Sequence, residues 1–324
     1  MSDRALALAS VVPAPLRELL RSRALKLQRP VLGRRLGRHR SARAGVGLDF
    51  RDHRAYVPGD DPRLLDWRAV ARRERLVLRQ TEAEDELSLV LLVDGSGGMA
   101  YGEGSAQKFA VARALAGGLA WLATRQGDPV GLAVGADGIV ADATARPSSS
   151  PERLAGIAEQ LQNPTLRGNC PWPALFDAVG PRLPRRSLVV VVSDALDPSS
   201  DGVPTDEADE TFLRGLASIR ARRHDVVVLQ TLHRDETEFP WTDRTTLRFI
   251  DLFGRRKPRE GAAAGMREGY LAAVAAHQSR LAARCEDEGL LLHTVHTDED
   301  LATAFLGLLG RFEGAPQTAE VSTP

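Results

Sequence analysis

The feature that most constrains the fold is a set of nearly continuous apolar runs. The clearest of them cover residues 87–93, 188–192 and 226–231 and consist mainly of leucine and valine. Such strands are typical of a parallel sheet with both faces covered, because a sheet with one wet face has alternating polar residues. Helical stretches separate the runs, so the chain from residue 87 onward is predicted to form an α/β sheet with helices on both faces.

The remaining elements of this region follow from the spacing of apolar residues and turn residues. Further strands are predicted at residues 129–134, 246–252 and 290–295, and residues 139–143 are expected to pair antiparallel with the first of these. Helices are predicted at residues 108–122, 151–162, 173–179, 205–223, 266–288 and 298–312, with Asp298 as the N-cap of the last one.

The part of the chain before residue 87 has a different character. Leucines at helical spacing in residues 14–28 predict an amphipathic helix with a basic face, which we interpret as a solvated surface helix. Two strands are predicted on either side of a turn at residues 57–63. We therefore divide the chain into a basic N-terminal helix and loop at 1–44, a β-hairpin segment at 45–86, an α/β domain at 87–312 and a disordered tail at 313–324.

Composition and charge narrow the classes of function. The 43 Lys and Arg residues balance the 43 Asp and Glu residues, so the chain lacks the basic excess of a nucleic-acid-binding protein. Basic residues are concentrated in residues 17–43, which could make weak contacts with an anionic membrane or nucleic acid. Two separated cysteines exclude a disulfide framework, and no apolar stretch is long enough to span a membrane. These features predict a cytoplasmic protein without an integral membrane segment.

Two of the predicted core strands end in an aspartate. Asp94 follows the run at 87–93 and leads into a glycine-rich loop, and Asp194 follows the run at 188–192. Because open parallel sheets bind ligands at the carboxyl ends of strands, both carboxylates are expected to face one crevice. Carboxylate and hydroxyl oxygens suit Mg²⁺ or Mn²⁺ better than zinc. The alternative is that each aspartate only caps the helix that follows it.

Two stretches of the sequence resemble known families. The order Asp94-x-Ser96 followed by Asp194 resembles the metal-ion-dependent adhesion site of von Willebrand factor A domains. Residues 50–72 (FRDHRAYVPGDDPRLLDWRAVAR) resemble the signature of the bacterial domain of unknown function fifty-eight family, and this longer motif is the more specific one. Shorter similarities to that family follow at residues 247–251, Tyr270, His277, Cys285 and Thr297, so the resemblance covers roughly residues 32–312.

The resemblance implies a Rossmann-like, von Willebrand factor A-type sheet, no established enzymatic activity, and genetic association with MoxR-type AAA+ ATPases. The sequence departs from the adhesion-site pattern in two places. Gly98 stands where the pattern has its second serine, and Asn169 stands where it has a threonine. An asparagine carbonyl oxygen can bind a hard cation, whereas glycine has no side chain. The implied site is therefore depleted, with waters completing the coordination of Mg²⁺, and consists of Asp94, Ser96, Asn169 and Asp194.

The signature segment also alternates arginines and aspartates around two aromatic residues. Guanidinium groups pair with carboxylates and stack on aromatic rings, so these residues can form a rigid polar network that fixes the segment. The alternative is a docking surface for a protein partner. In that case the partner-binding residues are Arg54, Tyr56, Asp60, Arg63, Asp66 and Trp67.

Three functions are compatible with these patterns. The first is a non-catalytic protein-binding module, in which an acidic residue of a MoxR-type ATPase or its client completes the coordination of Mg²⁺ during chaperone-like assembly or maturation. The second is a metal-dependent hydrolase, although Asp94 has no Asp-x-Asp partner and the chain has no phosphate-binding loop or Gly-x-Ser-x-Gly motif. The third is attachment to anionic surfaces through residues 17–43. We favour the first function and expect no enzymatic activity.

Overall fold

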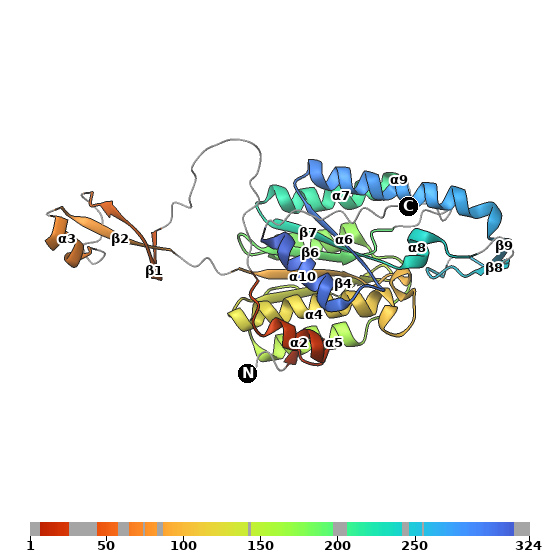
Figure 1. The fold of residues 1–324 in the computed structure, drawn as a ribbon, viewed down its shortest axis with the longest axis horizontal. Helices are drawn as coiled ribbons and strands as arrows, with labels where there is room; N and C mark the ends of the chain where they lie inside the picture. The colour runs from red at the N-terminus through yellow and green to blue at the C-terminus, as the bar shows by residue number, and fades with distance from the viewer. Residues whose placement is uncertain are drawn as a thin grey trace. The chain divides into compact units, whose positions relative to one another are not determined.

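The computed structural model describes residues 7–25, 44–57, 65–73, 75–82, 87–141, 144–196, 206–241, 246–254 and 256–313. Contacts divide the chain into a larger unit, which combines Met1–Pro30 with Leu87–Pro324, and a smaller unit, which comprises Val31–Glu86 (Figure 1). Residues 26–43, which make up most of the predicted basic attachment segment, lie outside the described residues. The predicted disordered tail lies outside them from residue 314 onward.

The larger unit is built on a sheet that is parallel except at one edge. Within the described residues its strand order is β10-β7-β6-β3-β4-β5, and β5 alone runs antiparallel to its neighbour. The strands are β3 (Leu89–Asp94), β4 (Val130–Ala136), β5 (Ile139–Ala141), β6 (Leu188–Ser193), β7 (Asp225–Leu232) and β10 (Leu291–His296). The predicted α/β sheet is confirmed. After β3 the chain forms β4 on one side and β6 on the other, so β3 and β6 flank a topological switch point.

Helices cover both faces of this sheet, which explains why its central strands are apolar on both sides. In β3, Leu89, Leu91 and Val93 enter one hydrophobic cluster, whereas Val90 and Leu92 enter another. The first cluster is completed by α2 (Ala14–Leu20), α4 (Lys108–Gln126), α5 (Pro151–Gln162) and α10 (Leu301–Phe312). The second is completed by α6 (Trp172–Val179), α7 (Asp206–Ala221) and α9 (Ala264–Asp287), and Figure 1 shows these helices on the two sides of the strands.

Several short elements of the larger unit differ from the sequence prediction. A five-residue helix, α8 (Arg234–Glu238), follows β7, and β8 (Thr246–Phe249) pairs antiparallel with β9 (Arg259–Ala262). Single 3-10 turns occupy η2 (Gly97–Ala100), η3 (Gly104–Ala106) and η4 (Gly180–Arg182). The predicted N-cap of the last helix is wrong by two residues. Asp300, rather than Asp298, accepts a hydrogen bond from the N–H of Thr303 at 2.9 Å.

The smaller unit pairs two strands around a short helix. β1 (Ala44–Ala55) runs antiparallel to β2 (Val77–Glu82), as predicted, and α3 (Trp67–Arg73) lies between them in the sequence. Helix α3 is absent from the prediction. It begins after Asp66, whose carboxylate accepts a hydrogen bond from the N–H of Ala69 at 3.0 Å, as an N-cap does.

Helix α4 contacts elements from both ends of the larger unit. Helix α2 packs on it through Leu16 and Leu20, which are 2% and 0% exposed, whereas Glu18 is exposed, so the predicted amphipathic surface helix is confirmed. It ends at Leu20 and is shorter than the predicted range of 14–28. Arg125 of α4 also donates a hydrogen bond to the carbonyl of Leu20 at 2.9 Å. On the same helix, Gly118 leaves room for Phe305 of α10, because a Cβ at this glycine would overlap the ring.

The docking of α2 predicts a stability effect. Leu20→Ala is expected to lower the free energy of unfolding by about 2–5 kcal/mol, the range for removing a buried leucine side chain. Arg23→Ala, at an exposed position of the same segment, is expected to change it by less than about 0.5 kcal/mol. Urea denaturation followed by circular dichroism measures both values. Equal effects of the two substitutions would show that α2 is not part of the core.

Candidate functional site

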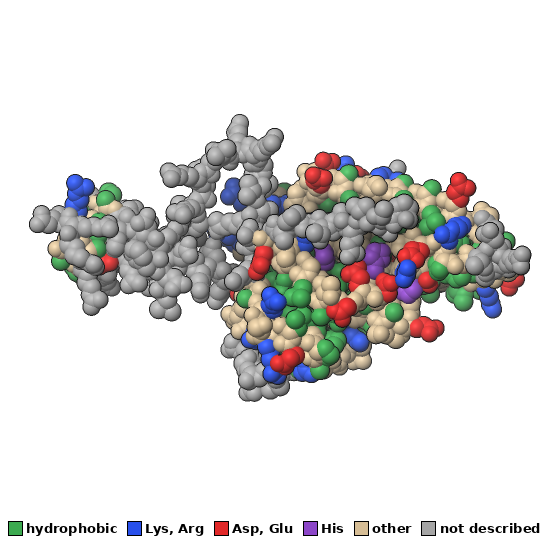
Figure 2. Space-filling view, viewed as in Figure 1, with side chains coloured by type: hydrophobic (Ala, Val, Ile, Leu, Met, Phe, Trp, Pro, Cys, Tyr) green, Lys and Arg blue, Asp and Glu red, His purple; other side chains and the backbone are tan. Residues whose placement is uncertain are grey.

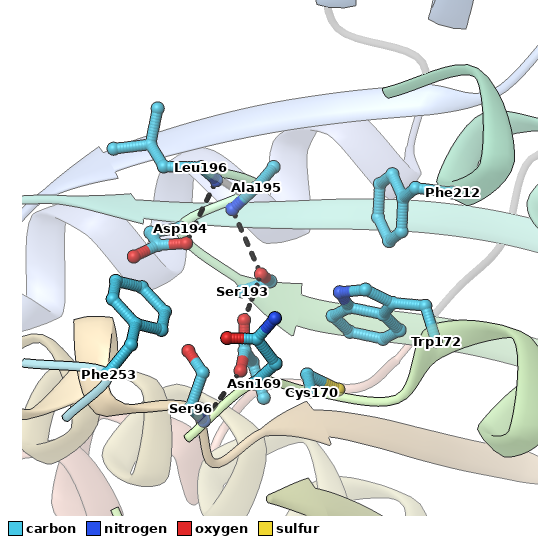
Figure 3. Close-up of a pocket in the computed structure, with 11 residues that line it drawn as sticks. Ser96, Asn169, Cys170, Trp172, Ser193, Asp194, Ala195, Leu196, Phe212 and Phe253 are labelled. Atoms are coloured by element: carbon cyan, nitrogen blue, oxygen red, sulfur yellow. Dashed lines mark hydrogen bonds between the residues drawn. The ribbon is translucent and has the colours of Figure 1, made fainter. Parts of the chain in front are cut away.

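A small pocket lies at the carboxyl ends of β3 and β6, at the topological switch point of the sheet (Figure 3). Its cavity has a volume of about 20 Å³, which is enough for one water molecule or one cation. All four residues predicted to bind a metal line it, namely Asp94, Ser96, Asn169 and Asp194. The other lining residues are Cys170, Trp172, Ser193, Ala195, Leu196, Phe212 and Phe253. Residues from two strands and from the loop before α6 thus meet in one place.

Asp94 ends β3 and is buried. Its Oδ1 accepts a hydrogen bond from the N–H of Ser96 at 2.8 Å, and its Oδ2 accepts one from the hydroxyl of Ser193 at 2.5 Å. Burial and the nearby charge of Asp194 raise the pKa of Asp94 to about 7, although the hydrogen bonds oppose this shift. This carboxyl group therefore gains or loses its proton near neutral pH. The hydrogen bond from Ser96 stabilises the turn after β3. This role resembles the alternative prediction, in which Asp94 only caps the following helix.

Asp194 follows β6 and is also buried. Its Oδ1 accepts a hydrogen bond from the N–H of Leu196 at 2.9 Å. The turn is held from α9 as well, because Nε2 of the buried His277 lies 2.9 Å from the carbonyl oxygen of Ala195. The other carboxylate oxygen, Oδ2, faces the glycine-rich loop after β3, since a Cβ placed on Gly98 would lie 2.9 Å from it.

Asn169 contributes a buried amide oxygen to the pocket. Its Oδ1 is buried and accepts no hydrogen bond from the described residues. Figure 3 shows the side chain pointing into the pocket, toward the side where Ser96 and Phe253 lie. A buried carbonyl oxygen without a partner is costly, so a cation or a donor group in the pocket would stabilise the site.

Lys108, at the start of α4, is a site residue that no sequence pattern indicated. It is 1% exposed, and its Nζ lies 2.7 Å from Asp194 Oδ2 and 2.6 Å from Glu236 Oε1. We call these three residues the Lys108 bridge. Burial lowers the pKa of Lys108, but the two neighbouring carboxylates raise it above its ordinary value, so the ammonium stays charged. The bridge places a positive charge directly beside a predicted metal ligand.

Glu236 connects the bridge to α8. Its Oε2 accepts a hydrogen bond from the N–H of His233 at 2.8 Å, and Nδ1 of His233 accepts one from the N–H of Asp235 at 3.2 Å. This reciprocal arrangement is a capping box, which fixes the start of the helix. Burial raises the pKa of Glu236, whereas the charge of Lys108 opposes that shift. The hydroxyl of Tyr101 donates to Asp235 at 2.8 Å and ties α8 to the loop after β3.

The residues of the pocket fit a hard cation only in part. The two carboxyls, the Ser96 hydroxyl and the unpartnered Asn169 oxygen are the kind of donors that Mg²⁺ prefers. Across the described ranges, however, no three His, Cys, Asp or Glu side chains form a group that could hold a metal. Lys108 already neutralises one of the two carboxylates. The site therefore fits a weakly held cation better than a tightly bound one.

The pocket does not single out a nucleophile for the hydrolase alternative. Cys170 lines it, but the described lining residues include no histidine that could act as a base for the thiol. Asp94 is engaged at both carboxylate oxygens, by Ser96 and by Ser193.

The residues predicted to bind a partner lie in the smaller unit or outside the described residues. Asp60 and Arg63 lie outside them, and only the backbone of Arg54 is described, as part of β1. The predicted network of arginines and aspartates therefore stays a prediction.

Three of these residues are described with their side chains. Tyr56 is half-buried, and its N–H donates to the carbonyl of Leu76 at 2.9 Å. Asp66 caps α3, so it has a structural role. Trp67 is 65% exposed and leaves a large aromatic surface open.

The raised pKa of Asp94 predicts a pH dependence of stability. From about pH 3.8 to about pH 7 the folded chain keeps a proton that the unfolded chain has lost, so the stabilising contribution of this group decreases as pH rises. Asp94→Asn has no such proton, so its stability relative to the unsubstituted chain is expected to increase as pH rises from about 4 to about 7. Urea denaturation in EDTA measures the difference. Asp177→Asn, at an exposed position of α6, is the control, and identical pH profiles of the two variants would contradict the prediction.

Comparisons with known proteins place the chain among uncharacterized relatives. Mb1516 of Mycobacterium bovis and MT1527 and Rv1480 of Mycobacterium tuberculosis, each described as an uncharacterized protein, are 28% identical over 284 residues, which is 87% of this chain and 84% of each relative. A crystal structure of an uncharacterized membrane spanning protein from Vibrio fischeri matches 69% of this chain and 97% of that chain at 15% identity, with a TM-score of 0.21. In the described part of this chain, no helix is both long and apolar enough to cross a membrane.

One family matches most of the chain. Its description is "Protein of unknown function DUF58", and it matches residues 52–280. This range runs from β1 to α9 and includes the four predicted metal ligands and the Lys108 bridge. The chain therefore belongs to the DUF58 family of proteins of unknown function.

Proposed function

We propose that the chain is a non-catalytic protein-binding module that holds its partner at the pocket formed by Asp94, Ser96, Asn169 and Asp194. In this proposal the sheet is of the von Willebrand factor A type and the pocket is a depleted metal-ion-dependent adhesion site. A weakly held Mg²⁺ or Mn²⁺ connects these residues to an acidic side chain of the partner. The partner is a MoxR-type AAA+ ATPase or its client, and the pair assists assembly or maturation of that client.

The observation that carries the proposal is the side-chain oxygen of Asn169, which has no hydrogen-bond partner among the described residues. This buried Oδ1 lies in a pocket that also contains the carboxyls of Asp94 and Asp194. Oxygen acceptors gathered in one place repel one another unless a cation or a set of donors lies between them. A cation with an open coordination position can then take a carboxylate from another protein.

Apolar side chains beside the pocket favour a protein partner over a free anion. Phe253 lines the pocket, and its neighbours Ile250 and Leu252 are 64% and 38% exposed. The backbone of Leu252 lies against the loop after β3, because a Cβ on Gly97 would overlap it. Exposed apolar residues next to a polar pocket are typical of sites where proteins bind one another.

A second contact is proposed in the smaller unit, at the exposed Trp67. Tryptophan is enriched among the residues that dominate binding energy in protein interfaces. Val57 and Leu76 of the same unit are 54% and 47% exposed, so this unit offers further apolar surface.

The partner class comes from the resemblance to the bacterial family and not from the geometry of the pocket. A cytoplasmic location is part of the same proposal. It is supported by Cys170 and Cys285, which are not joined in a disulfide, as expected in a reducing compartment.

Binding to a purified MoxR-type ATPase from the same genome tests the proposal. In Mg²⁺, Asp94→Asn and Asn169→Ala are each expected to weaken the complex at least tenfold, about 1.4 kcal/mol, and EDTA is expected to do the same. Asp177→Asn is the matched control and should bind like the unsubstituted chain. Biolayer interferometry measures all four. If the complex survives EDTA and both pocket substitutions but is lost in Trp67→Ala, the docking surface lies in the smaller unit. If no complex forms at all, the proposed class of partner is contradicted.

Restoring the missing serine tests the metal site itself. Gly98→Ser adds a hydroxyl beside Asp194 Oδ2 and is expected to tighten Mg²⁺ binding. The added Cβ would lie 2.9 Å from that oxygen and 3.2 Å from the ring of Phe253, so Gly98→Ala is needed to separate crowding from the hydroxyl. Isothermal titration calorimetry compares the two variants. Equal Mg²⁺ affinities for serine and alanine would count against the position assigned to the metal.

A further inference from the structure

The Lys108 bridge holds a permanent cation at the site that is proposed to bind a metal. Nζ of Lys108 donates to Asp194 Oδ2 at 2.7 Å and to Glu236 Oε1 at 2.6 Å. The sequence has only three lysines among its 43 basic residues, and this one is 1% exposed. An ammonium that is buried between two carboxylates differs from a surface ion pair, because removing either partner leaves a buried charge uncompensated.

The ammonium and the proposed metal require the same oxygen. Asp194 Oδ1 accepts the N–H of Leu196 in the turn after β6, whereas Oδ2 accepts from the ammonium of Lys108. Oδ2 is also the oxygen that faces Gly98, where the adhesion-site pattern has its second serine. Two cations at about 4 Å from each other repel strongly in a buried site. One of them must therefore give way when the other contacts Oδ2.

We propose that Lys108 is the resident cation of this site and competes with a divalent cation for Asp194 Oδ2. This inference rests on the proposed metal site and identifies the residue that sets its affinity. Glu236 provides Lys108 with a second carboxylate, so the ammonium stays paired when a metal takes Oδ2. The capping box of α8 holds Glu236 in position for that exchange.

The charges around the bridge act on a metal in opposite directions. Asp94, Asp194 and Glu236 together supply three carboxyl groups, against the single ammonium of Lys108 that pairs with two of them. The excess of carboxyls attracts a further cation, whereas Lys108 repels it. The affinity for a metal therefore depends on how strongly Glu236 draws Lys108 away from Asp194.

Direct Mn²⁺ binding to the full chain tests the competition without any partner protein. Lys108→Met retains a linear side chain but removes the charge, and it is expected to bind Mn²⁺ at least tenfold more tightly than the unsubstituted chain. Glu236→Gln removes the competing carboxylate, so Lys108 stays on Asp194 and Mn²⁺ is expected to bind several-fold more weakly. Lys257→Met, at an exposed lysine, is the matched control and should leave the affinity unchanged. Electron paramagnetic resonance of free Mn²⁺ measures each dissociation constant.

A second substitution locates the bound Mn²⁺. Asp94→Asn, introduced into the Lys108→Met chain, is expected to remove the gain in affinity, because the ion is then deprived of a pocket carboxylate. Lys108→Met leaves two buried carboxylates without a cation, so circular dichroism is recorded first to establish that the variant is folded. If the Lys108→Met chain is unfolded, the Glu236→Gln chain alone tests the competition. It retains the ammonium of Lys108 and is expected to bind Mn²⁺ more weakly, which is the opposite change.

The outcomes separate this inference from the proposed function. Unchanged Mn²⁺ affinity in a folded Lys108→Met chain, or unchanged or tighter binding in Glu236→Gln, would overturn the competition and leave the proposed site in place. An absence of Mn²⁺ binding in every variant would overturn both the competition and the metal-dependent part of the proposed function.

Discussion

The parallel pairing of β3 with β6 is the constraint from which the rest of the site follows. Leu89 to Val93 pair with Leu188 to Val192 in register, so the two strands deliver Asp94 and Asp194 to the same edge of the sheet. Both faces of these strands are apolar and covered, and the acids meet where little water remains. Burial and the nearby charge of Asp194 raise the pKa of Asp94, and the ammonium of Lys108 offsets the charge of Asp194. The polar chemistry of the pocket is thus a response to two like charges that an apolar sheet brings together.

The sequence predicts this meeting of acids because strand ends are visible as the points where apolar runs stop. Asn169 was assigned through the resemblance to the adhesion-site pattern. The sequence does not predict the Lys108 bridge. The helix that begins at residue 108 was expected, but the direction of a long side chain depends on tertiary contacts. Glu236 lies in a five-residue helix, which is too short to show helical periodicity in the sequence. That helix follows β7, and the order of the strands along the chain does not reveal that β7 lies beside β6. The scarcity of lysine, with only three in an arginine-rich chain, was the available signal.

The dependence of side-chain positions on tertiary contacts also explains the smaller differences between prediction and structure. The apolar face of α2 was evident from its leucines, but only the packed chain shows that Leu16 and Leu20 face α4 instead of water. Asp298 and Asp300 both suit an N-cap, and backbone geometry decides between them. In the smaller unit, Asp66 belongs to the family motif and also caps the N-terminus of α3, so its place in the motif has a structural reason.

Helix α4 has a consequence for the synthesis of the chain. It is covered by α2 from the beginning of the sequence and by α10 from its end, with Phe305 seated over Gly118. The part of α4 that packs on α10, which includes Gly118, therefore remains open on the ribosome until residues 301–312 have emerged, long after α2 and most of the sheet are available. Nascent chains that expose such a surface are prone to aggregate and are clients of general chaperones. During synthesis, the core of the larger unit is therefore complete only after α10 has packed on α4.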